Sequence, residues 1–223
     1  MPISDFNGLA AASANWMGRS GNADYTANFQ DFVTLTEDWL NNGNDDPDFP
    51  CPPLRVSQME VPSTTLTVLV STNSVLLPPD YLAMRSNYIT AAPNNIRLRY
   101  LSPAQMTDTV SNQLTGPQQF FTIKANQLIL PAAVTTTNTL VLDYYQRIPA
   151  LSSSNTVNWL ITISPRIYLS GTQLQGALFV RDMSDAQMHA KSFSGAIRAF
   201  QKQDSKNRWA AGPLQQMTDV GSP

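Results

Sequence analysis

Hydrophobic residues recur every three or four positions near both ends of the chain and form short runs between them. In the first part, this helical spacing covers Asp5–Met17 and then Tyr25–Leu40. Asp5 or the preceding serine can cap the first helix, and the segment 41–47 ends the second with Gly43 and turn residues. We therefore expect two amphipathic helices whose aromatic side chains need later helices or another subunit to cover them.

The acidic residues of this region are expected on the polar side of the second helix and in the loop after it. The helix carries Asp24, Asp31, Glu37 and Asp38 on that side. The pairs Glu37–Asp38 and Asp45–Asp46 lack apolar surroundings that would raise a carboxyl pKa. Neither pair is therefore expected to work as a general acid or base.

Strand-like runs replace the helical spacing from about residue 54 onward. They are rich in Val, Thr, Leu and Tyr and lie at 66–70, 97–101, 120–124, 128–130 and 139–145. The segment Ala125–Gln127 separates two of these runs and places Asn126 at a hairpin turn. Because helical spacing is absent here, we expect a small antiparallel sheet or a barrel-like insertion.

The last part of the chain predicts a helical hairpin. Ser164–Pro165 supplies an N-cap and a first-turn proline, and the helix continues to about Phe179. A second helix is expected from Ser184, which is followed three residues later by Gln187, as in a capping box. Only about Asp182–Met183 lies between the helices, so they should pack antiparallel.

These elements predict an α+β protein: an α-helical bundle of N-terminal and C-terminal helices with an inserted antiparallel β-rich domain. We expect four parts along the chain. They are the N-terminal helices with a Pro-rich loop (1–53), the β-rich insertion (54–157), the C-terminal helical hairpin (158–206) and a C-terminal arm (207–223).

Charge is scarce in this chain. Charged side chains make up 13% of its 223 residues, about half of the ~25% typical of a soluble domain, and the formal net charge is −2. There is no basic surplus with which to hold nucleic acid through its phosphates. No apolar run approaches the ~20 residues that span a bilayer.

Residues that could carry out chemistry are few. One cysteine (Cys51) and one histidine (His189) cannot form a disulfide within the chain or supply the four ligands of a structural zinc site. Cys51 lies between prolines, with no helix N-terminus to lower its pKa, so we expect an inert thiol rather than a catalytic dyad. Motifs for phosphate binding, calcium binding and nucleophilic catalysis are absent. We therefore expect no enzyme, no metal and no cofactor.

The second helix of the hairpin has a basic side, formed by Lys191, Arg198, Lys202, Lys206 and Arg208. This side could touch DNA. Three nearby carboxylates instead favour a solvated or interfacial face: Asp182, Asp185 and Asp204.

The tail after this helix has two interpretations. It is either a frayed terminus or an arm that becomes ordered on a partner. The second interpretation is motivated by its large apolar side chains, which a purely solvated tail would lack: Trp209, Leu214 and Met217.

Several segments resemble one protein family in the same order. Leu142–Ser152 reads LDYYQRIPALS and is followed by Asn158–Leu160 and by Pro165–Leu169. This succession resembles tailed-bacteriophage head-to-tail adaptor proteins, also called head-completion or connector proteins. Further segments that match in order are Leu77–Arg85, Ala125–Pro131 and Phe29–Glu37, so that the resemblance covers about residues 24–217. One departure is Arg166, where the family usually has Asp.

The resemblance implies a structural virion protein in the head–tail neck, assembled in the cytoplasm of the host bacterium. The family is expected to form a homo-oligomeric ring, a dodecamer, that joins the portal protein to tail or nozzle proteins. Such a ring extends the DNA channel, and genomic DNA passes through its lumen without specific binding. We expect the C-terminal arm to make the portal or neighbour contact through Trp209, Leu214 and Met217. The scarcity of charge then fits a subunit that is mostly interface.

Two alternatives stay open at this point. A tail-tube or nozzle subunit is also a ring-forming structural protein, but it would have no affinity for isolated portal. A carbohydrate-binding module would need exposed flat faces on Trp159 or on Tyr144 and Tyr145.

Overall fold

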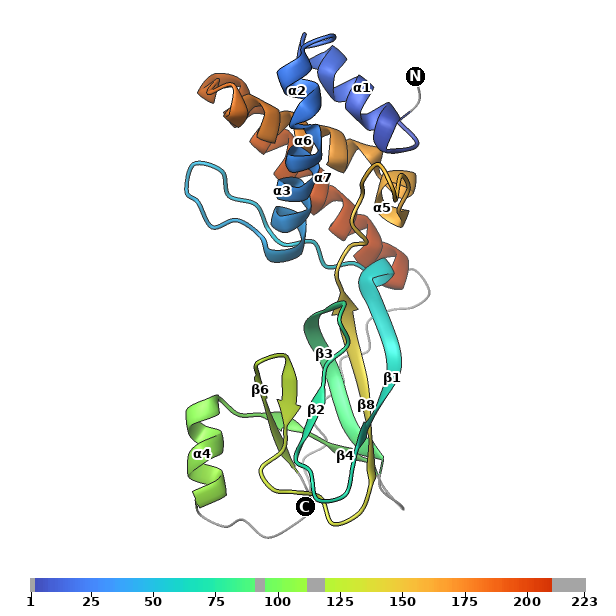
Figure 1. Ribbon diagram of the computed structural model, residues 1–223, viewed down its shortest axis with the longest axis vertical. Coiled ribbons are helices and arrows are strands. Elements are labelled where there is room, and N and C mark those ends of the chain that lie inside the picture. Colours follow the sequence, from blue (N-terminus) through green and yellow to red (C-terminus); the bar gives the residue numbers. More distant parts are fainter. Residues whose placement is uncertain (1–2, 91–94, 112–118, 210–223) are drawn as a thin grey trace. The chain divides into compact units, whose positions relative to one another are not determined.

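The computed structural model describes residues 3–90, 95–111 and 119–209 (Figure 1). The chain divides into two compact units, a helical unit of Met1–Gln58 and Ile148–Pro223 and a β unit of Met59–Arg147. The predicted α+β class, with helices towards both ends and antiparallel strands between them, is confirmed. The division into four parts stays a prediction.

The helical unit is built around one central helix. Its helices are α1 (Phe6–Trp16), α2 (Ala23–Ala27), α3 (Phe29–Asn42), α5 (Trp159–Ile163), α6 (Pro165–Phe179) and α7 (Met183–Trp209). Eleven consecutive residues of α6, from Ile167 to Ala177, are buried, and α6 contacts α1, α3, α5 and α7. A helix that is buried on every side forms the centre of a bundle, so the other helices pack around α6.

Two glycines of α6 allow this close packing. A Cβ atom at Gly171 would overlap Thr36 of α3 and lie 2.9 Å from the Phe193 ring of α7. A Cβ atom at Gly176 would lie 2.8 Å from the ring of Tyr25 in α2. Because Gly has no Cβ, three neighbouring helices approach the backbone of α6 at these two positions.

The N-terminal helices differ in one respect from the prediction. The first is confirmed as α1, with the Asp5 carboxylate accepting from the backbone N–H of Gly8 at 2.7 Å. The second is interrupted at Asn28, which ends α2 and begins α3. The predicted end is confirmed, because Gly43 caps α3 with a φ of 81°, a conformation that favours glycine.

The C-terminal hairpin is confirmed, but its second helix begins earlier and ends later than predicted. Asp182 caps α7 by accepting a hydrogen bond from Asp185 N–H at 3.1 Å, so the predicted capping box at Ser184–Gln187 is wrong. The Asp182 carboxylate is as good a cap as a serine hydroxyl and lies two residues earlier. Met188 in the second turn of this helix is 58% exposed.

The β unit contains two sheets and one helix in its described part. Its elements are β1 (Glu60–Val68, preceded by a 3-10 turn at Ser57–Met59), β2 (Ser74–Leu76), β3 (Tyr81–Thr90), β4 (Ile96–Arg97), β5 (Arg99–Tyr100), α4 (Pro103–Ser111), β6 (Phe120–Lys124), β7 (Gln127–Ile129) and β8 (Asn138–Gln146). The strand orders are β1-β8-β3-β4 and β2-β7-β6-β5, and all pairs are antiparallel except β5 with β6.

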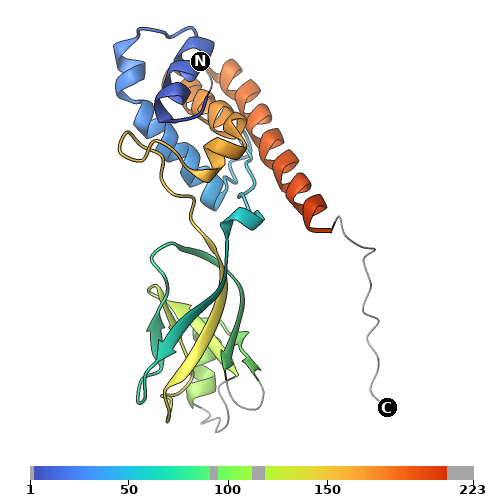
Figure 2. The same ribbon diagram turned by 90° about the vertical axis from the view of Figure 1, so that its right-hand side faces the viewer.

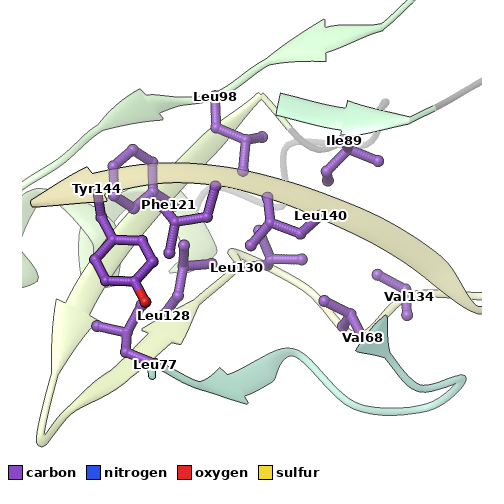
Figure 3. Close-up of a cluster of buried hydrophobic side chains, with 11 residues drawn as sticks. Val68, Leu77, Ile89, Leu98, Phe121, Leu128, Leu130, Val134, Leu140 and Tyr144 are labelled. Atoms are coloured by element: carbon purple, nitrogen blue, oxygen red, sulfur yellow. The ribbon is translucent and has the colours of Figure 1, made fainter. Parts of the chain in front are cut away.

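Apolar side chains from both sheets form one core inside the β unit (Figure 3). Leu140 and Leu142 of β8 are fully buried, as is Leu128 of β7, and Phe121 of β6 is 4% exposed. The predicted run 97–101 is split between the sheets, with β4 in one and β5 in the other. Leu98, between these two strands, is buried in the shared core.

The β6–β7 hairpin is confirmed as predicted. Lys124 pairs with Gln127, so the loop contains only Ala125 and Asn126. Their φ angles are 50° and 59°, which is the backbone of a type I′ turn. The tolerance of Asn for positive φ explains why the sequence signal was sufficient here.

Three elements of the β unit were not predicted: the helix α4 and the strands β2 and β3. Helical spacing was considered absent from this region, but Pro103–Ser111 forms α4. Ser102 and Gln105 cap it reciprocally, since Ser102 N–H donates to the Gln105 side chain and Gln105 N–H to the Ser102 hydroxyl. The strand β3 was also missed, because its sequence YLAMRSNYIT does not alternate and its pairing with β8 shifts register twice.

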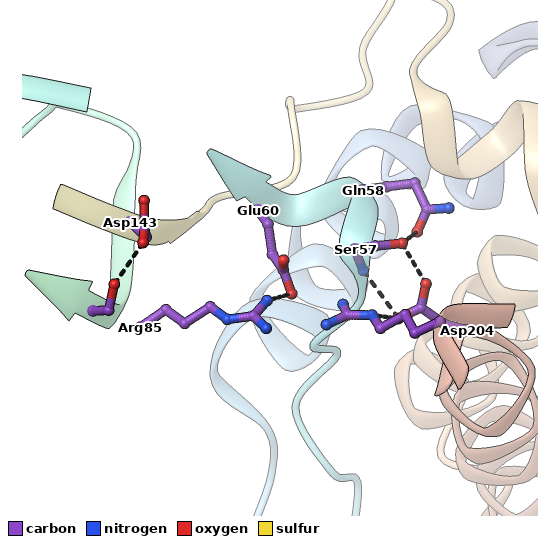
Figure 4. A network of polar contacts seen from close by, with 8 residues as sticks. Ser57, Gln58, Glu60, Arg85, Asp143 and Asp204 are labelled. Atoms are coloured by element: carbon purple, nitrogen blue, oxygen red, sulfur yellow. Dashed lines mark hydrogen bonds and ion pairs between the residues drawn. The ribbon is translucent and has the colours of Figure 1, made fainter. Parts of the chain in front are cut away.

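A bulge in β1 is fixed by a carboxylate of the neighbouring strand β8. The register shifts between Val61 and Thr64, and Ser63 there adopts a φ of 54°. Asp143 accepts from Ser63 N–H at 2.7 Å. It also accepts from the hydroxyl of Ser86 in β3 (Figure 4). These hydrogen bonds, first of all the one from Ser63, lower the pKa of Asp143. The bulge is therefore held by a charged acceptor across the sheet.

Replacing Gly171 with Ala should destabilise the helical unit. The new Cβ would overlap Thr36 and crowd Phe193, and such overpacking costs about 1–3 kcal/mol. Gly195→Ala in α7 is the matched control, because its Cβ would meet nothing within 4 Å and Ala favours a helix by roughly 1 kcal/mol. Urea unfolding followed by circular dichroism measures both. Equal unfolding free energies for the two variants would contradict the packing at Gly171.

Candidate functional site

The one cysteine of the chain is buried and its one histidine is half-buried. Cys51 is 5% exposed, and burial raises the pKa of its thiol to about 11. Its Sγ lies 3.7 Å from its hydrogen-bond acceptor, the carbonyl oxygen of Pro52. His189 is half-buried on α7, and burial lowers its pKa. The thiol is therefore protonated at neutral pH, which agrees with the predicted inert loop thiol.

The residues that the structure describes include no group of three or more Cys, His, Asp or Glu side chains that could hold a metal ion. None of the described helices is both long enough and apolar enough to cross a membrane. Two surface clefts contain no Asp, Glu, His or Cys side chain among their lining residues. One, of about 370 Å³, lies against α1 and includes Ala10, Ala14 and Tyr25, and one of about 280 Å³ in the β unit includes Arg85, Arg97 and Tyr100.

The prediction for Glu37 is wrong. This carboxyl was expected to face solvent, but it is 7% exposed and points into the helical unit. Burial raises its pKa to about 7, against the opposing effect of hydrogen bonds from Tyr168 and Leu151. The Glu37 Oε1 atom accepts from the Tyr168 hydroxyl at 2.7 Å and from the Leu151 backbone N–H at 2.8 Å.

The contacts of Glu37 belong to a larger polar network on the segment that resembles the adaptor family. Asn158 donates to Tyr168 Oη and to the Pro149 carbonyl, both at 2.7 Å, and its own Oδ1 caps α5 by accepting from Ile161 N–H. From α3, Asn41 accepts from Ile148 N–H at 3.1 Å. The family-like residues Ile148–Leu151, Asn158 and Tyr168 thus hold the returning chain against α3 and α6.

A second buried carboxylate holds the chain where it leaves the helical unit. Asp204 of α7 is 8% exposed and accepts hydrogen bonds from the backbone N–H and the hydroxyl of Ser57 (Figure 4). Arg208, one turn later, donates to it at 3.0 Å. Asp204 was expected among the solvated neighbours of the basic side, so this expectation is wrong: the carboxylate points inward.

These two carboxylates hold segments of the backbone in place. Each accepts hydrogen bonds from backbone N–H groups, and neither lines the clefts described above. The chain leaves the helical unit after Gln58 and returns at Ile148. Asp204 and Glu37 therefore fix the two segments next to these crossing points. No single residue in the sequence indicated that Asp204 and Glu37 fix these segments. The family-like segment around Ile148–Leu151 and Asn158 did indicate the region in which Glu37 acts.

The predicted anchor residues lie at or beyond the limit of the described chain. Helix α7 ends at Trp209, but the side chain of Trp209 lies outside the described residues, as do Leu214 and Met217. The portal or neighbour contact assigned to these three residues therefore stays a prediction.

Large apolar side chains are exposed on both units. The helical unit exposes Trp16 by 70%, Met188 by 58% and Leu35 by 47%. The β unit exposes Leu76 by 64% and Leu69 by 59%. Single exposed apolar residues are ordinary in monomers, but such side chains also supply the anchors of protein–protein interfaces. These exposed side chains are therefore the candidate contact sites of the described chain.

Replacing Glu37 with Gln should change the pH dependence of stability. The variant keeps the Oε1 acceptor and removes the charge. Because the pKa of Glu37 is about 7 in the folded chain and 4.5 ordinarily, the native state binds more protons between these values. The stability that the protonated carboxyl provides is present below about pH 4.5 and is lost as the pH rises through 7.

Glu37→Gln should therefore match the wild type at low pH and exceed it by at most roughly 3 kcal/mol at pH 8. Urea unfolding across this range measures the difference. Asp38→Asn, next to it on the exposed side, is the control and should show no such trend. Parallel pH profiles for Glu37→Gln and the wild type would contradict the buried position of Glu37.

Comparison with known proteins agrees with this organisation. The model of the SU10 adaptor protein family matches residues 4–217, which include both units. None of the curated proteins matches the chain. The family consists of structural phage adaptors and is not known for enzymatic activity. The chain therefore belongs to the SU10 adaptor protein family of phage head-to-tail adaptors.

Proposed function

We propose that the protein forms a ring in the neck of the virion, where it joins the portal to the tail and extends the DNA channel. The observation that carries this proposal is the family match along both units rather than along one of them. The ring is expected to be dodecameric and to contact tail or nozzle proteins. It would be assembled in the cytoplasm of the host bacterium.

A ring of identical subunits needs interfaces in which one face of each subunit meets a different face of the next. Exposed apolar side chains on both units support the availability of such faces. Genomic DNA would pass through the lumen without specific binding, and a net charge of −2 is compatible with passage.

The carbohydrate-binding alternative needs exposed aromatic faces, and Tyr144 and Trp159, which were named for it, are not exposed. Tyr144 is 4% exposed and its hydroxyl donates to Asp80 at 2.9 Å, so it offers no flat exposed face. Trp159 is half-buried in the helical unit. A tail-tube or nozzle subunit stays the main alternative, and portal affinity separates it from an adaptor.

The C-terminal arm is proposed as the portal contact, with Trp209, Leu214 and Met217 as its anchors. The truncation that tests this should remove residues 210–223 and keep Arg208, whose guanidinium supports Asp204. Portal binding should be lost while the thermal unfolding temperature stays unchanged.

Point variants refine the test. Leu214→Ser with Met217→Ser should weaken portal binding roughly tenfold or more, as expected for interface anchors. Gln215→Ser with Gln216→Ser is the matched control and should bind as the wild type does. Mass photometry with purified portal measures both. Unchanged binding of the truncated chain would overturn the role of the arm, and absence of wild-type binding would favour the tail-tube alternative.

A further inference from the structure

Opposite charges are separated between two parts of the helical unit. Residues 20–54 contain seven carboxylates and no Lys or Arg: Asp24, Asp31, Glu37, Asp38, Asp45, Asp46 and Asp48. Residues 186–209 contain one carboxylate and five basic residues: Lys191, Arg198, Lys202, Lys206 and Arg208. The net charge of −2 is therefore the sum over a chain that contains one strongly acidic segment and one strongly basic segment.

The acidic segment presents a defined face on α3. Asp31, Leu35 and Asp38 are exposed and follow one another at helical spacing on the side opposite the buried Phe32, Thr36 and Leu40. Leu35 is 47% exposed between the two carboxylates. We call Asp31, Leu35 and Asp38 the α3 face.

The basic segment presents a second face on α7. Lys191, Arg198, Lys202 and Lys206 are exposed, and their spacing of seven, four and four residues keeps them on one side of the helix over about 22 Å. We call these four residues the α7 face. Asp48 and Lys191 line the same cleft, so this one cation has a carboxylate of its own copy nearby.

The middle of the α7 face is flat. Gly195 and Ala199 are exposed between the cations, and a Cβ at Gly195 would meet nothing within 4 Å. The nearby carboxylate Asp204 cannot neutralise the face, because it is buried and bonded to Ser57 and Arg208. A protruding apolar side chain such as Leu35 could therefore approach the α7 backbone closely with carboxylates beside it.

The two faces lie on opposite sides of the helical unit. Helix α6 contacts both α3 and α7, and in Figure 2 it lies between them, with α3 on one side and α7 on the other. The buried side of each outer helix is directed towards α6. The exposed α3 and α7 faces therefore point away from each other and cannot meet within one copy.

We propose that the α3 face of one copy binds the α7 face of the next copy, so that Asp31 and Asp38 pair with the cations around Arg198 and Lys202, and Leu35 packs near Gly195. This inference rests on the proposed ring and names its contact. Because the faces point in opposite directions, the contact is heterologous and can be repeated from subunit to subunit. Charge complementarity of this kind fixes partner and register.

Charge reversal tests the proposal. Arg198→Glu with Lys202→Glu places two carboxylates at the centre of the α7 face, where Asp31 and Asp38 are proposed to bind, and Asp31→Lys with Asp38→Lys makes the α3 face basic. Each full-length variant should self-associate at least roughly 100-fold more weakly than the wild type, because like charges then oppose each other. Mixing the two variants should restore assembly, since each then offers a complementary face to the other. Arg19→Glu with Arg166→Glu, outside the α7 face, is the control of equal charge change.

Sedimentation velocity over a concentration series measures self-association, and mass photometry on purified portal measures assembly there. Reversed variants that assemble as the wild type does, a mixture that fails to recover, or no self-association of the wild type in either assay would overturn the proposal. If the α7 face binds DNA instead, its reversal alone would abolish DNA retention and leave the ring intact. Self-association could be lost in each reversed variant and recover in the mixture while the wild type fails to bind portal. This result would refute the adaptor function and would leave the α3–α7 contact supported.

Discussion

The helical unit depends on the close packing of α3 and α7 against α6. Gly171 is the contact point, because the absence of a Cβ atom there leaves room for both Thr36 and Phe193. Once α6 is buried along Ile167–Ala177, the outer helices can expose only the sides that face away from it. The same packing places Glu37 inside the unit and Asp38, the next residue, outside. A single packing constraint thus separates the structural carboxylates from those available to a partner.

Sequence periodicity predicted the elements whose local signals agree with their packing. The α1 cap at Asp5, the Gly43 end of α3, the Asn126 turn and the proline start of α6 all follow from the chemistry of a few adjacent residues. Helix α4 also had such a signal, the Ser102–Gln105 capping box, which was not recognised because Val, Thr and Leu runs dominate the sequence around it. Glu37 and Asp204 could not be found this way, because their partners lie more than 100 residues away in the chain.

The scarcity of charge takes on a different meaning when the charges are placed on the fold. A composition of 13% charged residues suggested a surface made mostly for contact. Placement on the fold adds direction, since the α3 face carries carboxylates, the α7 face carries cations, and Asp204 beside the α7 face is buried. In a ring, cations that pair with the next subunit are not free to hold DNA by its phosphates. With few charged residues, and with the cations paired between subunits, a ring could associate through charge and still let DNA pass through its channel.

Head-to-tail contact between α3 and α7 is tested most directly by carbodiimide cross-linking of assembled particles, followed by mass spectrometry. This reagent joins a carboxylate to an amine only when the two are in direct contact. Asp31 or Asp38 should be linked to Lys202 or Lys206 in the oligomer and not in the monomer. Assembled particles that lack these links, while other surface carboxylates and lysines react, would contradict the proposed contact.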